Sequence, residues 1–145
     1  MIFSNLISAT KPLLISGCLL GLPCRYDGKV IQRPQLIEKL KGKNVIPVCP
    51  EQLGGLSTPR PPAKIVGGEG LDVIQGNAKV LTIEGRADVT AQFLRGAYAT
   101  LQIAKLLSPA KCILKAKSPS CGLYPTVGVT AALLLIHGFK VIEIA

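Results

Sequence analysis

The chain has 145 residues, 48% of them hydrophobic, and a formal net charge of +9 from 17 basic and 8 acidic side chains. This length suffices for one domain with a real core, so we expect a single domain over residues 1–145 with its core from about residue 13. The longest apolar run, Ala131–Ile136, is far too short to span a bilayer. Because Lys11 and Pro12 interrupt the only candidate signal segment, we expect a cytoplasmic protein that does not bind membranes.

The positive charge favours an anionic partner, such as a nucleotide, an RNA or a phosphorylated small molecule. The sequence shows no arginine-rich helix and no RNA-binding aromatic motif, and it has only three Phe and three Tyr residues. A small molecule is therefore the expected partner, and nucleic acid is the less favoured one.

The chain begins with a predicted strand, a helix and a second strand. Leu13–Ser16 is a continuous apolar run, which is typical of a buried strand. Residues 33–43 predict a short helix, because Pro34 can occupy its first turn. Residues 44–49 predict the second strand, and Pro47 argues against a central place for that strand in a sheet.

The middle of the chain is rich in Pro and Gly. Residues 57–70 contain three prolines and three glycines, so we expect a loop there. Residues 72–85 contain two short β-like runs on either side of Gln75–Asn77, which predict a small hairpin or edge pair.

The second half of the chain alternates between helices and strands. Residues 88–107 have apolar positions at helical spacing, with Asp88 or Thr90 available as a cap. A strand over 111–116, a helix over 127–138 and a strand over 139–144 are expected to follow.

This alternation predicts an α/β fold. We expect a Rossmann-like, three-layer α/β/α domain with a largely parallel sheet. The strands are continuous apolar runs, as expected when helices cover both faces of the sheet. In such sheets, ligands bind beyond the carboxyl ends of the strands.

The five cysteines fall in informative places along this pattern. Cys18 follows the first strand, Cys49 ends the second, and Cys121 lies in the loop after the strand over 111–116, so all three should meet at one edge of the sheet. Cys24 shares the first loop and is a fourth ligand, a redox partner or a packed residue. Cys112 begins its strand at the opposite edge, where a buried small hydrophobic residue is expected.

The placement of these thiols allows three interpretations: they hold an iron–sulfur cluster, they bind a zinc ion, or they line an ordinary pocket. Zinc sites usually contain a close CxxC pair, which this sequence lacks. Three thiolates on a four-iron cluster would leave one iron open to a soft substrate atom such as sulfur.

Polar neighbours of these cysteines admit both a chemical and a structural role. Glu51 is either a general acid or base, or a surface carboxylate that pairs with Arg60. Ser118 and Ser120 either orient a substrate or cap turns. The helix that opens near Thr130 follows the Cys121 loop closely, so its free N–H groups are expected to provide an anion site.

Five segments together resemble a bacterial domain family that was long uncharacterised and includes the thiouracil desulfurases. They are SGCLLGLPCRYDG, PVCPEQLGGLSTPRPPAKIVGG, DVTAQFLRGA, ILKAKSPSCG and GVTAALL, and they run from about residue 13 to the C-terminus. The resemblance implies a [4Fe-4S] cluster held by Cys18, Cys49 and Cys121, with one open iron for a thiocarbonyl sulfur that water replaces without net redox change. It also implies catalytic roles for Glu51 and Ser118.

The resemblance therefore implies an enzyme of the hydrolase or lyase type that acts on thiouracil or its nucleoside or nucleotide. Basic residues in or near the loops favour a phosphorylated substrate: Arg25, Lys29, Arg33, Arg60, Lys64 and Lys117. One departure is the short LYPTV segment, residues 123–127, where family members carry a longer Gly-rich and aromatic insert. Its loss would widen the pocket, shift substrate choice, or mark a non-catalytic metal- or sulfur-binding module that kept the fold.

Overall fold

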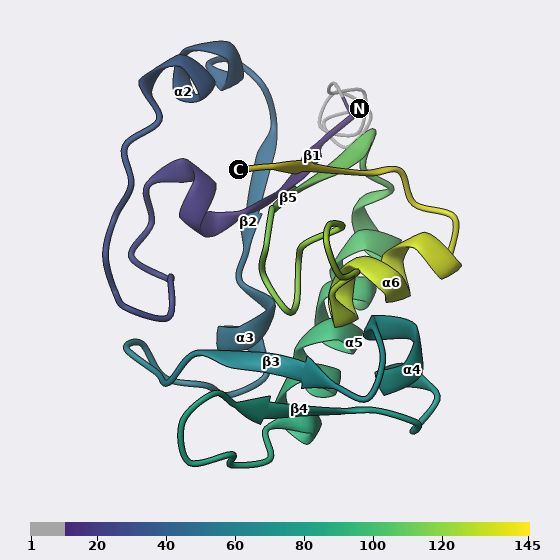
Figure 1. The fold of residues 1–145 in the computed structure, drawn as a ribbon. Coiled ribbons are helices and arrows are strands. Elements are labelled where there is room, and N and C mark those ends of the chain that lie inside the picture. Colours follow the sequence, from purple (N-terminus) through teal and green to yellow (C-terminus); the bar gives the residue numbers. More distant parts are fainter. Residues whose placement is uncertain (1–10) are drawn as a thin grey trace.

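Four parallel strands form the central sheet of the computed structural model, which describes residues 11–145 (Figure 1). The candidate signal segment lies mostly outside these residues. The strand order is β2-β1-β5-β6, and Leu14 of β1 pairs with Ile46 on one side and Cys112 on the other. The sheet confirms the expected parallel α/β architecture. Its strands are β1 (Leu13–Ser16), β2 (Val45–Val48), β5 (Lys111–Lys115) and β6 (Val141–Ile144).

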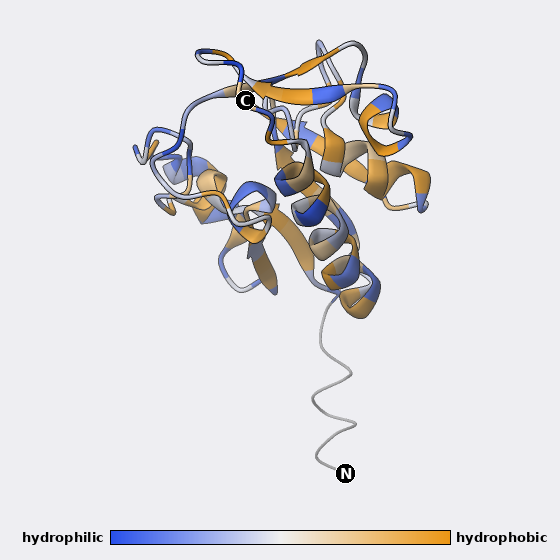
Figure 2. Ribbon diagram, turned by 90° about the horizontal axis from the view of Figure 1, so that it is seen from below, coloured by the Kyte–Doolittle hydropathy of each residue, from blue (hydrophilic) through white to orange (hydrophobic). Residues whose placement is uncertain are grey.

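Helices cover both faces of this sheet, which explains the buried apolar residues in the middle of its central strands β1 and β5. The larger core packs one face against α5 (Thr90–Leu107) and α6 (Val129–Ile136), around the fully buried Phe93. The smaller core packs the other face against the 3-10 helix η1 (Gly17–Leu20) and α2 (Pro34–Leu40). In Figure 2 the hydrophobic residues follow the strands and the helices packed beside them, whereas hydrophilic residues gather in the loops.

β2 is an edge strand of the sheet, which agrees with the objection that Pro47 raised to a central position. Proline has no backbone N–H to donate to a neighbouring strand. It is tolerated in β2 because β2 has a neighbouring strand, β1, on one side only. A short helix, α3 (Pro50–Leu53), follows β2 directly and carries the chain onto α5.

The middle of the chain departs from the expectation of a loop followed by a hairpin. β3 (Ala63–Val66) lies within the segment expected to be loop, and it pairs antiparallel with β4 (Lys79–Thr82). Between them, Gly70–Ile74 forms α4, where the sequence suggested a β-like run. The physical reason is a capping box: Glu69 and Asp72 each accept a hydrogen bond from the backbone N–H of the other, which starts a helix there.

The order of the strands also sets where a ligand can bind. From β1 the chain crosses outward to β2, and it later returns on the other side of β1 to β5 and β6. The carboxyl ends of β1 and β5 therefore flank the point at which the topology reverses, where open α/β sheets form their binding crevice. Among residues 11–145, no helix has the length and apolar character needed to cross a membrane.

Candidate active site

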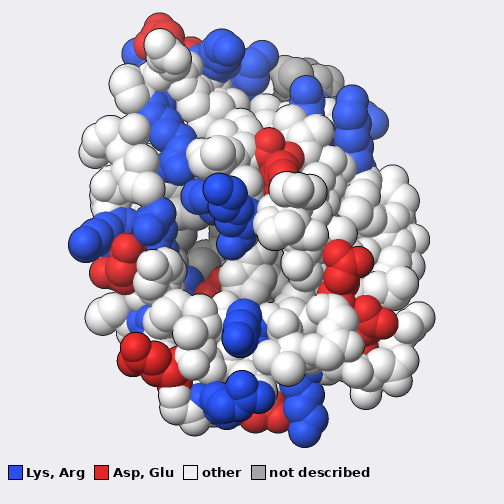
Figure 3. Space-filling model, viewed as in Figure 1, with Lys and Arg blue, Asp and Glu red and all other residues white. Residues whose placement is uncertain are grey.

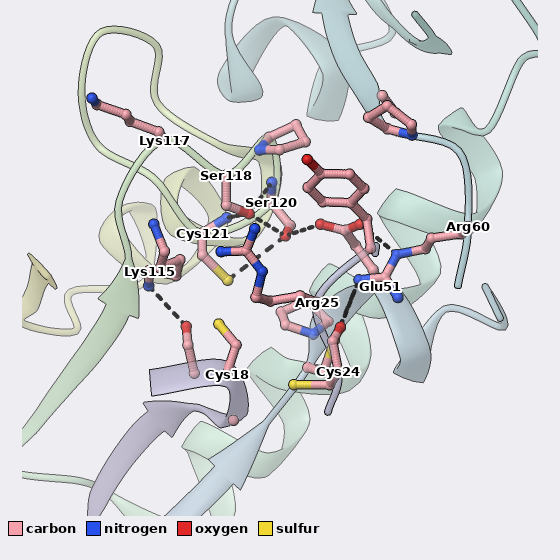
Figure 4. Close-up of a pocket in the computed structure, with 18 of the residues that line it drawn as sticks. Cys18, Cys24, Arg25, Glu51, Arg60, Lys115, Lys117, Ser118, Ser120 and Cys121 are labelled. Carbon is pink, nitrogen blue, oxygen red and sulfur yellow. Dashed lines mark hydrogen bonds and ion pairs between the residues drawn. The ribbon is translucent and has the colours of Figure 1, made fainter. Parts of the chain in front are cut away.

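A cavity of about 370 Å³ opens at the carboxyl edge of the sheet (Figure 4). Three loops build most of it, and each follows one of the strands β1, β2 and β5. The small β3–β4 sheet closes one side through Ala63 and Ile83. Its size is that of a site for a small molecule.

The structure brings four of the five cysteines to this cavity. Cys18, Cys49 and Cys121 come from the three loops, and Cys24 comes from the first loop as well. Cys112 lies elsewhere: it is fully buried in β5, paired with Leu14, as a small hydrophobic residue. Residues far apart in sequence thus present their thiols to one space, because parallel strands end at a common edge.

The surroundings of Cys18 and Cys49 lower the pKa values of both thiols. A hydrogen bond from the Cys24 thiol is the main cause that lowers the pKa of Cys18 to about 7, and Lys115 and Arg33 contribute positive charge. The same donor lowers the pKa of Cys49 to about 6. The backbone of Gln52 and the positive charge of Arg60, whose Nη2 lies 3.9 Å from the sulfur, lower the pKa of Cys49 further.

Cys24 and Cys121 remain thiols in this arrangement. The single S–H of Cys24 can be donated to the sulfur of Cys18 or of Cys49, and this interaction raises the pKa of Cys24 far above the ordinary range. Burial raises the pKa of Cys121 to about 12, and hydrogen bonds from Ser16 and Ser120 offset this only in part. The surroundings therefore lower the pKa of the thiols at Cys18 and Cys49 and raise that of Cys121.

Glu51 lies in α3 and faces the cavity between two partners. Its Oε1 accepts a hydrogen bond from Arg60 Nε at 2.9 Å, and its Oε2 accepts one from the Ser120 hydroxyl, also at 2.9 Å. The Arg60 pair expected from the sequence is present, but it is not a surface pair, because the Glu51 side chain is only 14% exposed. The carboxylate is thus held in one orientation while it lines the cavity.

The two serines of the SPSCG segment form a chain of hydroxyl groups that leads to Glu51. Ser118 Oγ lies 2.9 Å from Ser120 Oγ, which in turn donates to Glu51. Ser118 Oγ also accepts the backbone N–H groups of Ser120 and Cys121. Ser118 therefore stabilises the turn around Cys121 and contacts the cavity at the same time, which joins the two roles that the sequence left open.

Close backbone contacts fix the loops that carry these groups. Gly54, at the end of α3, and Gly96, in α5, pack so tightly that a Cβ on Gly96 would overlap the carbonyl oxygen of Pro50. At the SPSCG turn, a Cβ on Gly122 would come within 2.9 Å of the Lys117 nitrogen. Only glycine permits both approaches, so the positions of Cys49 and Cys121 depend on them.

Basic side chains surround the mouth of the cavity (Figure 3). Glu51 is the only acidic residue among its described lining residues, whereas four are basic: Arg25, Arg60, Lys115 and Lys117. Lys29, Arg33 and Lys64, which the sequence placed in or near these loops, do not line it. The cavity thus favours an anionic occupant.

The expected anion site at the start of α6 is wrong. The N–H of Val129 donates to the carbonyl of Pro119 at 2.9 Å, and the N–H of Ala131 donates to that of Ser120 at 3.0 Å. These bonds pin the SPSCG loop against the helix, so its first amides stabilise the loop instead of binding a ligand.

A family model described as 2-thiouracil desulfurase matches residues 13–144, nearly the whole chain. The chain belongs to this family. The desulfurase motifs of the sequence therefore coincide with the loops that build the cavity. The family match also supports an enzyme.

Two relatives extend this result. A Bacillus subtilis (strain 168) protein, the uncharacterized protein YbbK, is 43% identical over 143 residues, which cover 90% of this chain and 94% of that protein. A solved structure of TudS, a [4Fe-4S]-dependent thiouracil desulfidase, is 37% identical and aligns with a TM-score of 0.75 over 92% of this chain and 91% of its own. The desulfurase fold therefore extends across the chain.

Residues 123–127, where the resemblance implied the loss of an insert, do not wall the cavity. None of residues 123–127 lines it. Instead, Glu143 of β6 accepts the N–H of Leu123 at 2.6 Å, and Glu69 accepts that of Val127 at 3.2 Å. Tyr26, Lys115 and Ile83 do line it, although the sequence gave them no role. Lys115 ends β5 at the carboxyl edge, and that position is the signal that could have identified it.

Proposed function

We propose that this desulfurase-family chain removes sulfur from a thiolated pyrimidine, thiouracil or its nucleoside or nucleotide. The thiocarbonyl and water become a carbonyl and hydrogen sulfide, with no net change of oxidation state. One observation carries the proposal: thiols from three separate strand ends share a cavity with an oriented carboxylate. The name of TudS, a [4Fe-4S]-dependent thiouracil desulfidase, supports the same chemistry.

The residues of the cavity suit a [4Fe-4S] cluster by their donor chemistry, with Cys18, Cys49 and Cys121 as ligands. Thiolates are the usual ligands of such clusters, and two of these cysteines have lowered pKa values. Within residues 11–145, no three His, Cys, Asp or Glu side chains are arranged to hold a metal ion. The proposal therefore depends on the shared cavity and not on a preformed site. When bound, the cluster would supply an open iron as a Lewis acid for the substrate sulfur.

Cys24 is the remaining candidate ligand, and its surroundings argue against that role. Its S–H hydrogen bond to Cys18 or Cys49 favours the ionised form of those two proposed ligands, and Cys24 would lose this role if it bound iron itself. A Cβ on Gly17 would lie 3.1 Å from Cys24 Sγ, so the sulfur packs against the backbone of the first loop. We expect Cys24→Ser to keep the cluster.

The protein groups would handle the proton and the ring. Glu51 would take a proton from the attacking water, because both of its oxygens are already oriented toward the cavity by Arg60 and Ser120. Ser118 would hold the pyrimidine through its hydroxyl, at the end of the chain that leads through Ser120 to Glu51. Lys117 at the mouth favours a substrate that carries a phosphate, whereas the Arg25 guanidinium already pairs with Asp27 at 3.0 Å.

The test is anaerobic reconstitution with iron and sulfide, followed by measurement of sulfide released from thiouracil. We expect the wild type to turn brown and release sulfide, Cys121→Ala to lose both properties, and Glu51→Ala to keep the colour but lose turnover. Cys112→Ala is the matched control, because that cysteine is buried outside the cavity. A colourless wild type with stoichiometric zinc would instead indicate a non-catalytic metal-binding module.

Substrate form is tested in the same assay. We expect a thiolated uridine monophosphate to have a higher kcat/KM than the free base, and Lys117→Ala to remove that preference. Equal values for both substrates in the wild type would rule out a phosphate contact.

A further inference from the structure

The Arg60 side chain is only 6% exposed and contacts three groups at the cavity. Its Nε donates to Glu51 Oε1 at 2.9 Å, and its Nη2 donates to the carbonyl oxygen of Cys24, also at 2.9 Å. The same Nη2 lies 3.9 Å from the sulfur of Cys49, within hydrogen-bond reach of a sulfur acceptor. One guanidinium thus connects the proposed proton acceptor to a proposed cluster ligand.

The opposite side of the guanidinium is held just as firmly. Its Nη1 donates to Thr58 Oγ1 at 2.9 Å and to the carbonyl oxygen of Ser57 at 3.2 Å. Gln52 of α3 donates to the same Thr58 oxygen at 2.8 Å. The backbone N–H of Arg60 donates to the backbone carbonyl oxygen of Tyr26. These contacts fix the plane of the guanidinium before any ligand binds.

We propose that Arg60 is a positioning residue whose planar fork orients the Glu51 carboxylate and donates a hydrogen bond to the Cys49 sulfur. This inference rests on the proposed function of the cavity. Positive charge alone does not meet these demands, because the acceptors lie in different directions around one side chain. Arginine has five N–H donors in a rigid plane, whereas the lysine ammonium is a compact charge on a flexible stem.

The hydrogen bond to Cys49 has a consequence that activity does not report. Hydrogen bonds and positive charge at the thiolates of an iron–sulfur cluster set its reduction potential. Loss of the Arg60 donor should therefore make the potential more negative. A side chain that served only to stabilise the loop would leave the potential unchanged.

The experiment compares reconstituted wild type, Arg60→Lys and Arg60→Gln in potential and in kinetics. We expect both variants to bind the cluster, to show a more negative midpoint potential, and to lose about 10- to 100-fold in kcat with little change in KM. The matched control is Arg95→Lys. Arg95 donates to the carbonyl of Gly54 at the end of α3, at 3.0 Å, but does not line the cavity. The control should keep the wild-type potential and kcat.

A folded Arg60→Lys with wild-type potential and kcat overturns the inference, because charge would then suffice. If the Arg60 variants do not fold, Thr58→Val replaces them, since it removes the hydrogen bonds from Arg60 Nη1 and Gln52 but leaves the Arg60 contacts with Glu51, Cys24 and Cys49. It should lower kcat several-fold and shift the potential in the same direction, and no change in either overturns the inference. A wild type that binds no cluster overturns the proposed function as well, whereas an active wild type with unaffected Arg60 variants overturns only this inference.

Discussion

Cys49 follows β2 and Cys121 follows β5, the two strands on either side of β1, but the surroundings shift the pKa values of the two thiols in opposite directions. Cys49 lies at the start of α3 beside Arg60 and accepts a thiol hydrogen bond, which together lower its pKa to about 6. Cys121 is buried in the SPSCG turn, and burial raises its pKa to about 12 although the hydroxyl groups of Ser16 and Ser120 lie close to its sulfur. Burial alone penalises a thiolate, and only nearby donors or positive charge reverse that penalty.

This contrast has a consequence for how the site would load. Cys49 is ready to bind a cation at neutral pH, whereas Cys121 would release its proton only as a metal binds. The two sides of the cavity thus differ in chemistry although they share a topology. Four measurements test this difference between Cys49 and Cys121.

The largest expected effect is in thiol reactivity of the reduced, metal-free protein. At pH 7, iodoacetamide should modify Cys49 at least about 100-fold faster than Cys121, because the thiolate is the reacting species. Peptide mass spectrometry of timed samples measures each site. Denatured protein is the control, in which the two rates should converge. Equal rates in the folded protein would contradict the contrast.

The second prediction tests how the Cys49 side is positioned. Gly96→Ala should destabilise the protein by about 2 kcal/mol, because overpacking costs roughly up to 3 kcal/mol and alanine restores about 1 kcal/mol of helix propensity. The change should also slow modification of Cys49 but leave Cys121 unaffected. Urea unfolding measures the stability. Gln102→Ala, at an exposed site of the same helix, is the control and should change it by less than about 0.5 kcal/mol.

The third prediction tests the Cys121 side. Ser16 is 2% exposed, and its hydroxyl accepts the N–H of Lys115 at 2.9 Å and contacts Cys121. Ser16→Ala should destabilise the protein by about 1 kcal/mol and make Cys121 still less reactive. Urea unfolding and the alkylation assay measure both effects. Ser57→Ala removes a hydroxyl in an exposed loop, so a loss as large there would show that burial of Ser16 is not the cause.

The fourth prediction is a pH dependence of stability in the metal-free protein. Cys18 and Cys49 have folded-state pKa values of about 7 and 6, below the ordinary 9.0, so their contribution is present above pH 9 and lost as the pH falls toward 6. The urea midpoint of the wild type should therefore rise from pH 6 to 9. The rise should be smaller in Cys49→Ser. A midpoint that falls over this range would show that neither thiol ionises more readily when folded.

Much of the fold followed from local patterns. The continuous apolar runs predicted β1, β2, β5 and β6, and the helical spacing predicted α5 with its end before Pro109. The region around β3 and α4 did not follow, because its prolines and glycines conceal a strand whose partner is β4. The capping residues Glu69 and Asp72 could have predicted the start of α4, but the prediction for this region was based on the hydrophobic pattern alone.

The candidate site was predictable in part for a definite reason. Cysteines placed after parallel strands must meet at one edge, and Cys18, Cys49 and Cys121 do line one cavity. The sequence did not reveal that Ser120 links Ser118 to Glu51, since the bond joins residues 69 positions apart. It also left Arg60 as a surface partner, because burial depends on segments that pack around it.

Local patterns are enough to predict the α/β alternation, the family and the common edge for the three thiols, because strand patterns and motifs are local and parallel strands share a direction. The pKa shift of each thiol, the buried orientation of Glu51 and the contacts of residues 123–127 follow only from the folded arrangement of the loops. These properties depend on distances between groups on different loops. A thiol is ionised or protonated according to which distant donors fold against it, and no local stretch of sequence contains that information.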